Sequence, residues 1–304
     1  RHLLAELPDT LQRLAVLDRT KEPGAFGEPL YLDVTAALNE VDFHEIRVIG
    51  GRYGLSSKDT TPADMYAVFQ HLAREGHNHF TVGITDDVTH LSIEPALFPM
   101  PGDPSQISVK FWGIGSDGLV GASKNTAKII GDHTDKYVQA YFQYDSKKSG
   151  GLTISHLRFG DHPIRSAYYV GDADCVVCGN PSYVDKYDMV GDVKPGGVFL
   201  LTCSWSEEDL ERRLPTDMKR TLAQKGIHLY LCDAVTIARE IGLKGRINTI
   251  IQSAYFKLAG ILPAEEAIEY MKQGIVNDYA AKGQKIVDMN VAAVLAGQTA
   301  AREV

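Results

Sequence analysis

A strand-like run that leads into a glycine-rich turn and then into a helical pattern is the feature that most limits how this chain can fold. Residues 108–112 form the run, Gly113-x-Gly115-x-x-Gly118 follows, and a helix is expected from near Val120. This order is typical of a parallel sheet with helices on its faces. Glycine lets backbone N–H groups approach a phosphate, and the start of a helix adds partial positive charge. The turn is therefore a candidate phosphate site.

The same alternation of strands and helices extends over the chain and divides it. Residues 1–95 alternate strands with helices, and one helix is expected to begin after a Thr61 cap. Residues 96–107 hold three prolines, which predicts a linker. A second series occupies 108–304. We therefore expect an α/β fold, with two α/β domains that have mainly parallel sheets and a helical C-terminal end.

Apolar runs and turn signals place the individual elements. In the first domain we expect strands at 14–17, 45–51 and 80–84 and helices at 3–11 and 30–39. In the second domain we expect strands at 108–112, 137–144, 173–178, 197–202 and 227–232. Its helices are expected to start near Val120, Pro181, Glu207, Ala234 and Arg246 and to cover 264–279 and 283–296 at the end.

Composition and charge exclude several classes of function. The net charge of -8 leaves no surplus of cations for a nucleic-acid backbone, so no nucleic-acid partner is expected. No apolar run approaches the roughly 18 residues that span a bilayer, so no membrane segment is expected. The chain begins with Arg1 and not with Met, which suggests a segment processed or excised from a longer chain.

The cysteines indicate buried thiols. Four cysteines are too few for a disulfide framework in a chain this long, which favours a reducing compartment such as the cytoplasm. Cys175 and Cys178 have the spacing of a metal or redox pair, but they lie three residues apart in a strand-like run. Their side chains are therefore expected on opposite faces of a sheet. No second pair and no histidine at zinc spacing follow, so we predict no metal site.

A second strand supplies charged residues for the glycine turn. It ends at Asp145, and Lys147 and Lys148 follow. An acid at this place holds the ribose in a dinucleotide-binding fold, but a lysine pair favours a phosphate on the ribose, as in NADP or coenzyme A. Asp117 would repel a phosphate unless it holds a base or an amide. Arg246 is either a forked phosphate donor or a solvated capping charge, and its spacing alone favours the capping charge.

The remaining motifs suggest no catalysis. Cations within 155–158 and 164–166 either line the same cleft or are ordinary loop charges, and we favour loop charges. The sequence holds no nucleophile elbow, no HExxH and no GxxxxGK[ST]. We therefore expect no catalytic residue in this chain. An alternative interpretation of the glycine motif is a tight strand-to-helix turn that binds no ligand.

Several long runs of the sequence resemble pyruvate:ferredoxin (flavodoxin) oxidoreductase. Similar to its second domain are residues 16–31 (VLDRTKEPGAxGEPLY), 50–58 (GGRYGLSSK) and 80–90 (FTVGIxDDVTH). Similar to its third domain are residues 111–131, 144–151, 155–159, 180–184 and 194–197, followed by the helical end at 261–296. The resemblance covers almost the whole chain and implies a central fragment of that enzyme. Residues 1–95 would be part of a transketolase C-terminal-like domain, and 108–304 a gamma-type domain that contacts coenzyme A.

The resemblance also implies what the whole enzyme does. Enzymes of this family convert pyruvate to acetyl-CoA and CO2 on thiamine diphosphate with Mg, pass electrons through 4Fe-4S clusters to ferredoxin or flavodoxin, and form homodimers. The thiamine motif, a Gly-Asp-Gly with a downstream Asn, is absent here, and Cys175-x-x-Cys178 stands alone. We therefore expect the fragment to be inactive by itself. The implied location is the cytoplasm, or a mitochondrion or hydrogenosome in a eukaryote.

The resemblance maps coenzyme A contacts onto particular residues. They are Asp117, one lysine of the pair Lys147 and Lys148, with Lys148 preferred, and Arg246. The glycine turn adds Ser116 and Gly118 as further candidates for coenzyme A binding. Three alternatives stay open. A pyruvate:NADP oxidoreductase has the same core with a fused flavin reductase. A stand-alone NADP-binding oxidoreductase would use the glycine turn and both lysines, although no Tyr-x-x-x-Lys helix is found near the site. A non-catalytic assembly module would use the turn for structure alone.

Overall fold

The chain folds into two compact units, Arg1–Gly102 and Asp103–Val304. The computed structural model describes residues 2–41, 46–86, 88–94, 103–146 and 150–304. Both units are α/β with mainly parallel strands, as the sequence predicts. The domain bounds expected from the sequence stay a prediction, since residues 96–102 of the expected linker lie outside the described residues.

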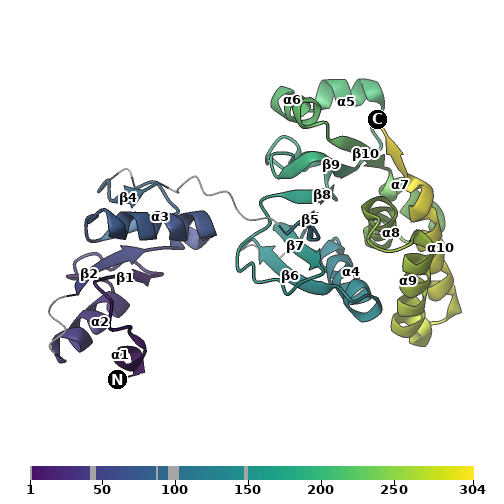
Figure 1. The fold of residues 1–304 in the computed structure, drawn as a ribbon. Coiled ribbons are helices and arrows are strands. Elements are labelled where there is room, and N and C mark those ends of the chain that lie inside the picture. The colour runs from purple at the N-terminus through teal and green to yellow at the C-terminus, as the bar shows by residue number, and fades with distance from the viewer. Residues whose placement is uncertain (1, 42–45, 87, 95–102, 147–149) are drawn as a thin grey trace. The chain divides into compact units, whose positions relative to one another are not determined.

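The first unit is a four-stranded parallel sheet, in the order β1-β2-β3-β4, with helices on both faces (Figure 1). Alternate residues of a strand face opposite sides, so the sheet buries one core against α2, around Val34, and another against α3, around Val68. The elements are α1 (His2–Glu6), β1 (Arg13–Asp18), α2 (Pro29–Asn39), β2 (Arg47–Arg52), η1 (Leu55–Ser57), α3 (Pro62–Ala73), β3 (Phe80–Val82) and β4 (Ser92–Ile93).

Helix α3 begins where the sequence predicts. The Thr61 hydroxyl accepts a hydrogen bond from the Asp64 N–H at 3.4 Å, and the Asp64 carboxylate accepts one from the Thr61 N–H at 2.7 Å. Pro62, the first residue of the helix, has no N–H to satisfy. The reciprocal pair therefore satisfies two backbone donors and fixes the start of the helix.

The second unit is built on a seven-stranded sheet in the order β11-β10-β9-β8-β5-β7-β6. β5, β8, β9 and β10 pair in parallel, β7 is antiparallel to both β5 and β6, and β11 is antiparallel to β10. The strands are β5 (Ile107–Ile114), β6 (Tyr137–Tyr144), β7 (Leu152–Gly160), β8 (Ala173–Cys178), β9 (Val193–Thr202), β10 (His228–Cys232) and β11 (Ala301–Glu303). The helices are α4 (Leu119–His133), η2 (Pro181–Tyr183), α5 (Glu207–Arg213), α6 (Thr216–Lys225), α7 (Ala234–Ile241), α8 (Asn248–Ala259), α9 (Ala264–Tyr279), η3 (Ala280–Lys282) and α10 (Gln284–Ala300).

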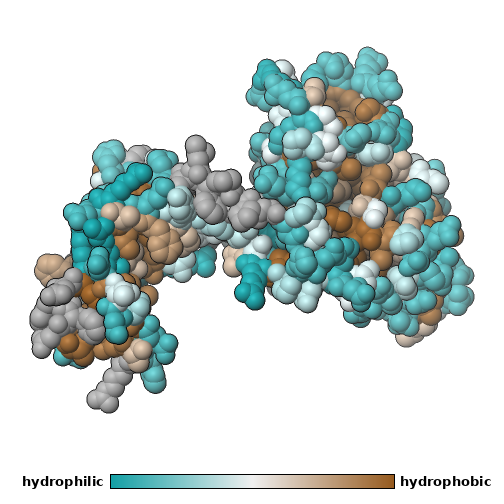
Figure 2. All heavy atoms as spheres, in the orientation of Figure 1, coloured by the Kyte–Doolittle hydropathy of each residue, from teal (hydrophilic) through white to brown (hydrophobic). Residues whose placement is uncertain are grey.

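Helices cover both faces of this sheet (Figure 1). Helices α4 and α7 to α10 bury one core with Phe111 and Tyr255, and α5 and α6 cover the other with Phe199. Figure 2 shows mainly polar side chains on the outside of each unit, with apolar patches between the elements. Cys175 lies in the first core and Cys178 in the second, and both are free and buried. The prediction of buried thiols on opposite faces is thereby confirmed.

The structure corrects several expected elements. Residues 155–158, whose charges suggest a loop, lie in β7, which is buried along almost its whole length. The elements β4, α6 and β11 are not expected from the sequence pattern. The helix expected near Pro181 is a single 3-10 turn, and the one expected near Arg246 begins at Asn248. α1 ends at Glu6 because Pro8 disfavours a helical conformation of the residue before it. Among the described residues, no helix is long and apolar enough to cross a membrane.

Candidate functional site

The glycine turn lies at the carboxyl end of β5, where the strand order reverses. On one side, β5 pairs in parallel with β8. After β5 the chain continues through α4 to β6, which lies on the other side of β5 in the sheet. Ligands of open α/β sheets bind in the crevice outside such a switch point. β5 ends at Ile114 and α4 begins at Leu119, so the predicted strand, turn and helix are confirmed.

Asp117 closes the turn with both oxygens of its carboxylate. Oδ2 accepts a hydrogen bond from the Ile114 N–H at 2.7 Å, and Oδ1 accepts one from the Leu119 N–H at 2.8 Å. Burial raises the pKa of Asp117, and these two hydrogen bonds oppose the rise. The carboxylate therefore bonds to the protein's own backbone, and Asp117 shapes the turn.

A side chain at either of two glycines of the turn would crowd its neighbours. A Cβ at Gly113 would lie 2.7 Å from Asp117 Oδ2. Gly118 has a φ of +86°, and a Cβ there would lie 3.0 Å from Cγ of Asn248. The Asn248 side chain, at the start of α8, thus lies against the turn although it is distant in the sequence. Ser116 also has a positive φ, at 83°, which is uncommon for a residue other than glycine.

The loop after β8 supports the turn from the other side. The Tyr183 hydroxyl donates a hydrogen bond to the Gly113 carbonyl at 3.1 Å, and the Gly179 N–H donates one to the Trp112 carbonyl at 2.9 Å. Burial raises the pKa of Tyr183 to about 12, with smaller contributions from Tyr187 and Asp117. The hydroxyl is therefore protonated at neutral pH and serves as a donor.

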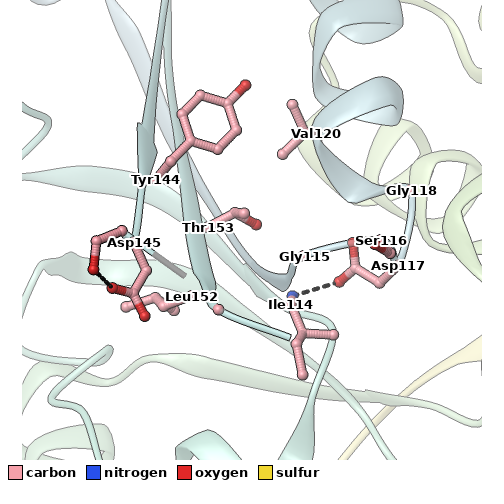
Figure 3. A pocket seen from close by; sticks show the side chains of 12 residues that line it. Ile114, Gly115, Ser116, Asp117, Gly118, Val120, Tyr144, Asp145, Leu152 and Thr153 are labelled. Carbon is pink, nitrogen blue, oxygen red and sulfur yellow. Dashed lines mark hydrogen bonds between the residues drawn. The ribbon is translucent and has the colours of Figure 1, made fainter. Parts of the chain in front are cut away.

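A cavity of about 540 Å³ opens beside the turn (Figure 3). The Gly115 N–H donates to the Gly151 carbonyl at 2.7 Å, which ties the turn to the segment before β7. In Figure 3 the side chains of Tyr144 and Val120 lie on opposite sides of the cavity. The lining residues are Ile114, Gly115, Ser116, Asp117, Gly118, Val120, Tyr144, Asp145, Ser146, Gly151, Leu152 and Thr153.

The structure brings together part of the site predicted from the sequence. Ser116, Asp117 and Gly118 line the cavity. Lys147 and Lys148 lie outside the described residues. Arg246 is exposed, does not line the cavity and precedes α8 by two residues, on the same segment as Asn248. Sequence reasoning missed Asn248 and Tyr144, because only the packing of α8 and β6 brings them to the turn.

The basic side chains of β7, His156 and Arg158, are not part of the cavity lining. His156 Nδ1 accepts a hydrogen bond from the Val170 N–H at 3.2 Å, and its ring stacks on Tyr169. Arg158 donates to Gln139 Oε1 at 2.9 Å and to the Tyr169 carbonyl at 2.8 Å. Burial, with Lys110 and Arg158 nearby, lowers the pKa of His156 to about 3. These side chains hold the segment after β7 and do not act as loop charges.

The described residues do not fit a metal ion or an iron–sulfur cluster. They include no group of three or more His, Cys, Asp or Glu side chains that could hold a metal. Burial raises the pKa of both Cys175 and Cys178 to about 12, whereas a cluster needs thiolates. No step of a reaction is therefore assigned to a metal held by these residues.

Solved structures of oxoacid oxidoreductases share a fold with about two thirds of this chain. A pyruvate oxidoreductase subunit from Thermotoga maritima matches with a TM-score of 0.53 and 20% identity, over 65% of this chain and 98% of that chain. A 2-oxoglutarate:ferredoxin oxidoreductase from Magnetococcus marinus, solved with coenzyme A and succinyl-CoA, matches with a TM-score of 0.50 and 15% identity. That match covers 65% of this chain and 31% of that one. At these identities the likeness shows the fold alone.

Curated relatives match nearly the whole chain at much higher identity. A pyruvate:ferredoxin oxidoreductase from Moorella thermoacetica is 56% identical over 96% of this chain, and a pyruvate-flavodoxin oxidoreductase from Klebsiella pneumoniae is 50% identical over 100%. A mitochondrial pyruvate dehydrogenase [NADP(+)] from Euglena gracilis is 48% identical over 95%. The chain spans 25%, 26% and 16% of the length of these three relatives. The family described as pyruvate ferredoxin/flavodoxin oxidoreductase matches residues 108–300, and the chain belongs to this family.

Proposed function

We propose that this chain is a central part of a pyruvate:ferredoxin or pyruvate:flavodoxin oxidoreductase and that its second unit binds coenzyme A at the glycine turn. The cavity at the carboxyl end of β5, with Ser116 and Gly118 at the start of α4, carries this proposal. A glycine turn at a helix start favours phosphate groups, and coenzyme A carries a pyrophosphate and a ribose phosphate. The names of the relatives support pyruvate as substrate, and the neighbour solved with coenzyme A supports the ligand.

The chain's own residues bind and orient the ligand. The Ser116 hydroxyl and N–H groups of the first turn of α4 donate to the pyrophosphate, except the Leu119 N–H, which donates to Asp117. Asp117 holds the turn in the conformation that presents these donors. Lys148 binds the ribose phosphate in preference to Lys147, and Arg246 adds a forked donor near the start of α8. Asn248, which lies against Gly118, positions the turn and adds an amide at its edge.

The other parts of the reaction belong to other domains of the whole enzyme. Thiamine diphosphate with Mg and the 4Fe-4S clusters would supply decarboxylation and electron transfer there. The first unit is part of a transketolase C-terminal-like domain. The partners are the remaining domains, a second copy in a homodimer, and ferredoxin or flavodoxin. The whole enzyme works in the cytoplasm, or in a mitochondrion or hydrogenosome of a eukaryote.

The position of β6 disfavours a stand-alone NADP-binding oxidoreductase. In a dinucleotide-binding fold, the strand that ends in the ribose-binding acid lies directly beside the first strand. Here β7 lies between β5 and β6, so the strands that end at Ile114 and Tyr144 are about 10 Å apart, twice the usual strand spacing. Asp145 is therefore placed differently from a ribose-binding acid. The name of the Euglena relative includes NADP(+), so a pyruvate:NADP oxidoreductase with the same core is the second candidate function.

Calorimetric titration of the 304-residue chain with coenzyme A and, separately, with NADPH tests the proposal. We expect saturable binding of coenzyme A and much weaker binding of NADPH. Tight NADPH binding with no response to coenzyme A would contradict the proposal and favour the stand-alone oxidoreductase. The variant Gly118→Ala, which places a Cβ against Asn248, is expected to weaken coenzyme A binding.

A further inference from the structure

The cavity has an aromatic wall beyond the phosphate turn. Tyr144 is the last residue of β6, lines the cavity and is 58% exposed. Figure 3 shows its ring on the opposite side of the cavity from Val120, in the first turn of α4. An exposed aromatic ring that faces an aliphatic side chain across a cavity offers a planar apolar group a surface on each side.

We propose that Tyr144 and Val120 form a slot that holds the adenine ring of coenzyme A, with the ring of Tyr144 stacked on the base. This assignment rests on the proposed function, because it assumes that coenzyme A is the ligand. It makes Tyr144 the residue through which this cavity recognises the nucleotide half of the ligand.

The strand register sets how far the slot lies from the turn. Tyr144 is paired with Thr153 of β7, and Thr153 is paired with Gly113 of β5. Two strand spacings, about 10 Å, therefore separate the strand positions of Tyr144 and Gly113. The ribose fits between a pyrophosphate at the turn and a base at Tyr144. The ligand then lies across the carboxyl end of β5 toward β6, over Thr153, which also lines the cavity.

The charges at the two ends favour this orientation over the reverse one. The exposed carboxylate of Asp145 follows Tyr144 and lines the cavity at that end. It disfavours a pyrophosphate beside Tyr144, whereas an uncharged base is tolerated. At the turn, Asp117 also lines the cavity, but the Ile114 and Leu119 N–H groups donate to its oxygens and compensate its charge, and the rest of the first turn of α4 favours an anion. The pyrophosphate therefore belongs at the turn and the base at Tyr144.

The same strand supplies a matched control. Tyr137, at the other end of β6, is 49% exposed, similar to Tyr144, but it does not line the cavity. Replacing either tyrosine by alanine removes the same side chain from the same edge strand. A change in affinity that appears at Tyr144 alone therefore reports the slot and not the general stability of β6.

The test is a calorimetric comparison of coenzyme A with 4′-phosphopantetheine, which lacks the nucleotide, on the 304-residue chain. Loss of base–aromatic stacking is expected to weaken coenzyme A binding roughly tenfold in Tyr144→Ala. Binding of 4′-phosphopantetheine should stay equal to that of the parent, as should coenzyme A binding in Tyr137→Ala. Tyr144→Phe, which keeps the ring, should keep the affinity of the parent.

The outcomes separate this inference from the proposed function. A parent chain that does not bind coenzyme A overturns both. A parent that binds it, with Tyr144→Ala binding it equally well, overturns the slot and leaves the proposed function standing. Equal losses for coenzyme A and 4′-phosphopantetheine also overturn the slot, because they indicate a general change in the cavity. If Tyr144→Ala does not fold, Tyr144→Thr removes the ring with a residue suited to a strand and gives the same comparison.

Discussion

At the scale of single residues, Asp117 in the glycine turn has a structural role that does not depend on a ligand. Asp117 bonds to the N–H groups of Ile114 and Leu119, which lie on either side of it in the chain. A negatively charged side chain is unexpected in a turn that is proposed to bind a negatively charged phosphate. The hydrogen bonds of Asp117 explain its presence, because its carboxylate joins the end of β5 to the start of α4. The sequence showed that Asp117 needed a second role, but the hydrogen bonds identify that role.

His156 makes the stability of the second unit depend on pH. Its pKa is lowered from 6.5 to about 3, so below pH 6.5 the unfolded chain binds a proton that the folded chain does not. The free energy of unfolding therefore contains the full contribution of the neutral His156 above pH 6.5, and this contribution is lost as the pH falls from 6.5 toward 3. Between pH 6.5 and pH 5 we expect the parent to lose about 2 kcal/mol more than His156→Gln. Urea unfolding at both pH values checks this.

His162→Gln, which removes an exposed histidine, serves as the control. It should follow the parent curve over the same pH range. Equal pH dependence in His156→Gln and the parent would mean that His156 titrates normally in the folded chain.

At the scale of elements, two glycines of one segment should respond to alanine in opposite directions. Gly118 has a positive φ, and its Cβ would lie 3.0 Å from Asn248, whereas Gly121 lies inside α4 with nothing within 4 Å of its Cβ. We expect Gly118→Ala to destabilise the chain by more than about 1 kcal/mol and Gly121→Ala to stabilise it by about 0.4–1 kcal/mol. Urea unfolding of both variants measures the difference. A stabilising Gly118→Ala would show that the turn tolerates a different backbone conformation.

Local sequence pattern predicted most helices and strands. It failed at β7, where polar side chains are buried. The expected strands at 137–144 and 173–178 agree with β6 and β8, because apolar and turn residues marked them. β7 was missed because His156 and Arg158 look like loop residues. Both are buried beside partners from distant segments, Val170 and Gln139 among them. A single sequence does not reveal such partners.

At the scale of the whole molecule, the two units have separate cores and separate sheets. The candidate cavity lies wholly within the second unit. The relatives are about four times as long as the chain or more, so the rest of the proposed enzyme lies in parts that this chain does not include. Kinetics of the whole enzyme therefore complement the titrations of this chain with coenzyme A.

For the whole enzyme we expect Lys148→Ala to raise KM for coenzyme A. Loss of a charged hydrogen bond of about 1.5–3 kcal/mol corresponds to roughly tenfold or more in affinity. The variant should lose less affinity for 3′-dephospho-coenzyme A than for coenzyme A, since the missing phosphate is its proposed partner. Steady-state kinetics with both substrates checks this, with Lys285→Ala, an exposed lysine of α10, as the control. An unchanged KM for coenzyme A would assign the phosphate to another residue.

The sequence by itself determined the α/β class, the strand, turn and helix at Gly113–Gly118, and the burial of Cys175 and Cys178. These follow from local periodicity and turn chemistry, which act over a few residues. Only the tertiary structure decided that β7 lies between β5 and β6 and that Asn248 lies against Gly118. The same packing placed Tyr144 at the wall of the cavity. The physical reason is that strand order and helix packing depend on contacts between distant segments, which no local pattern encodes.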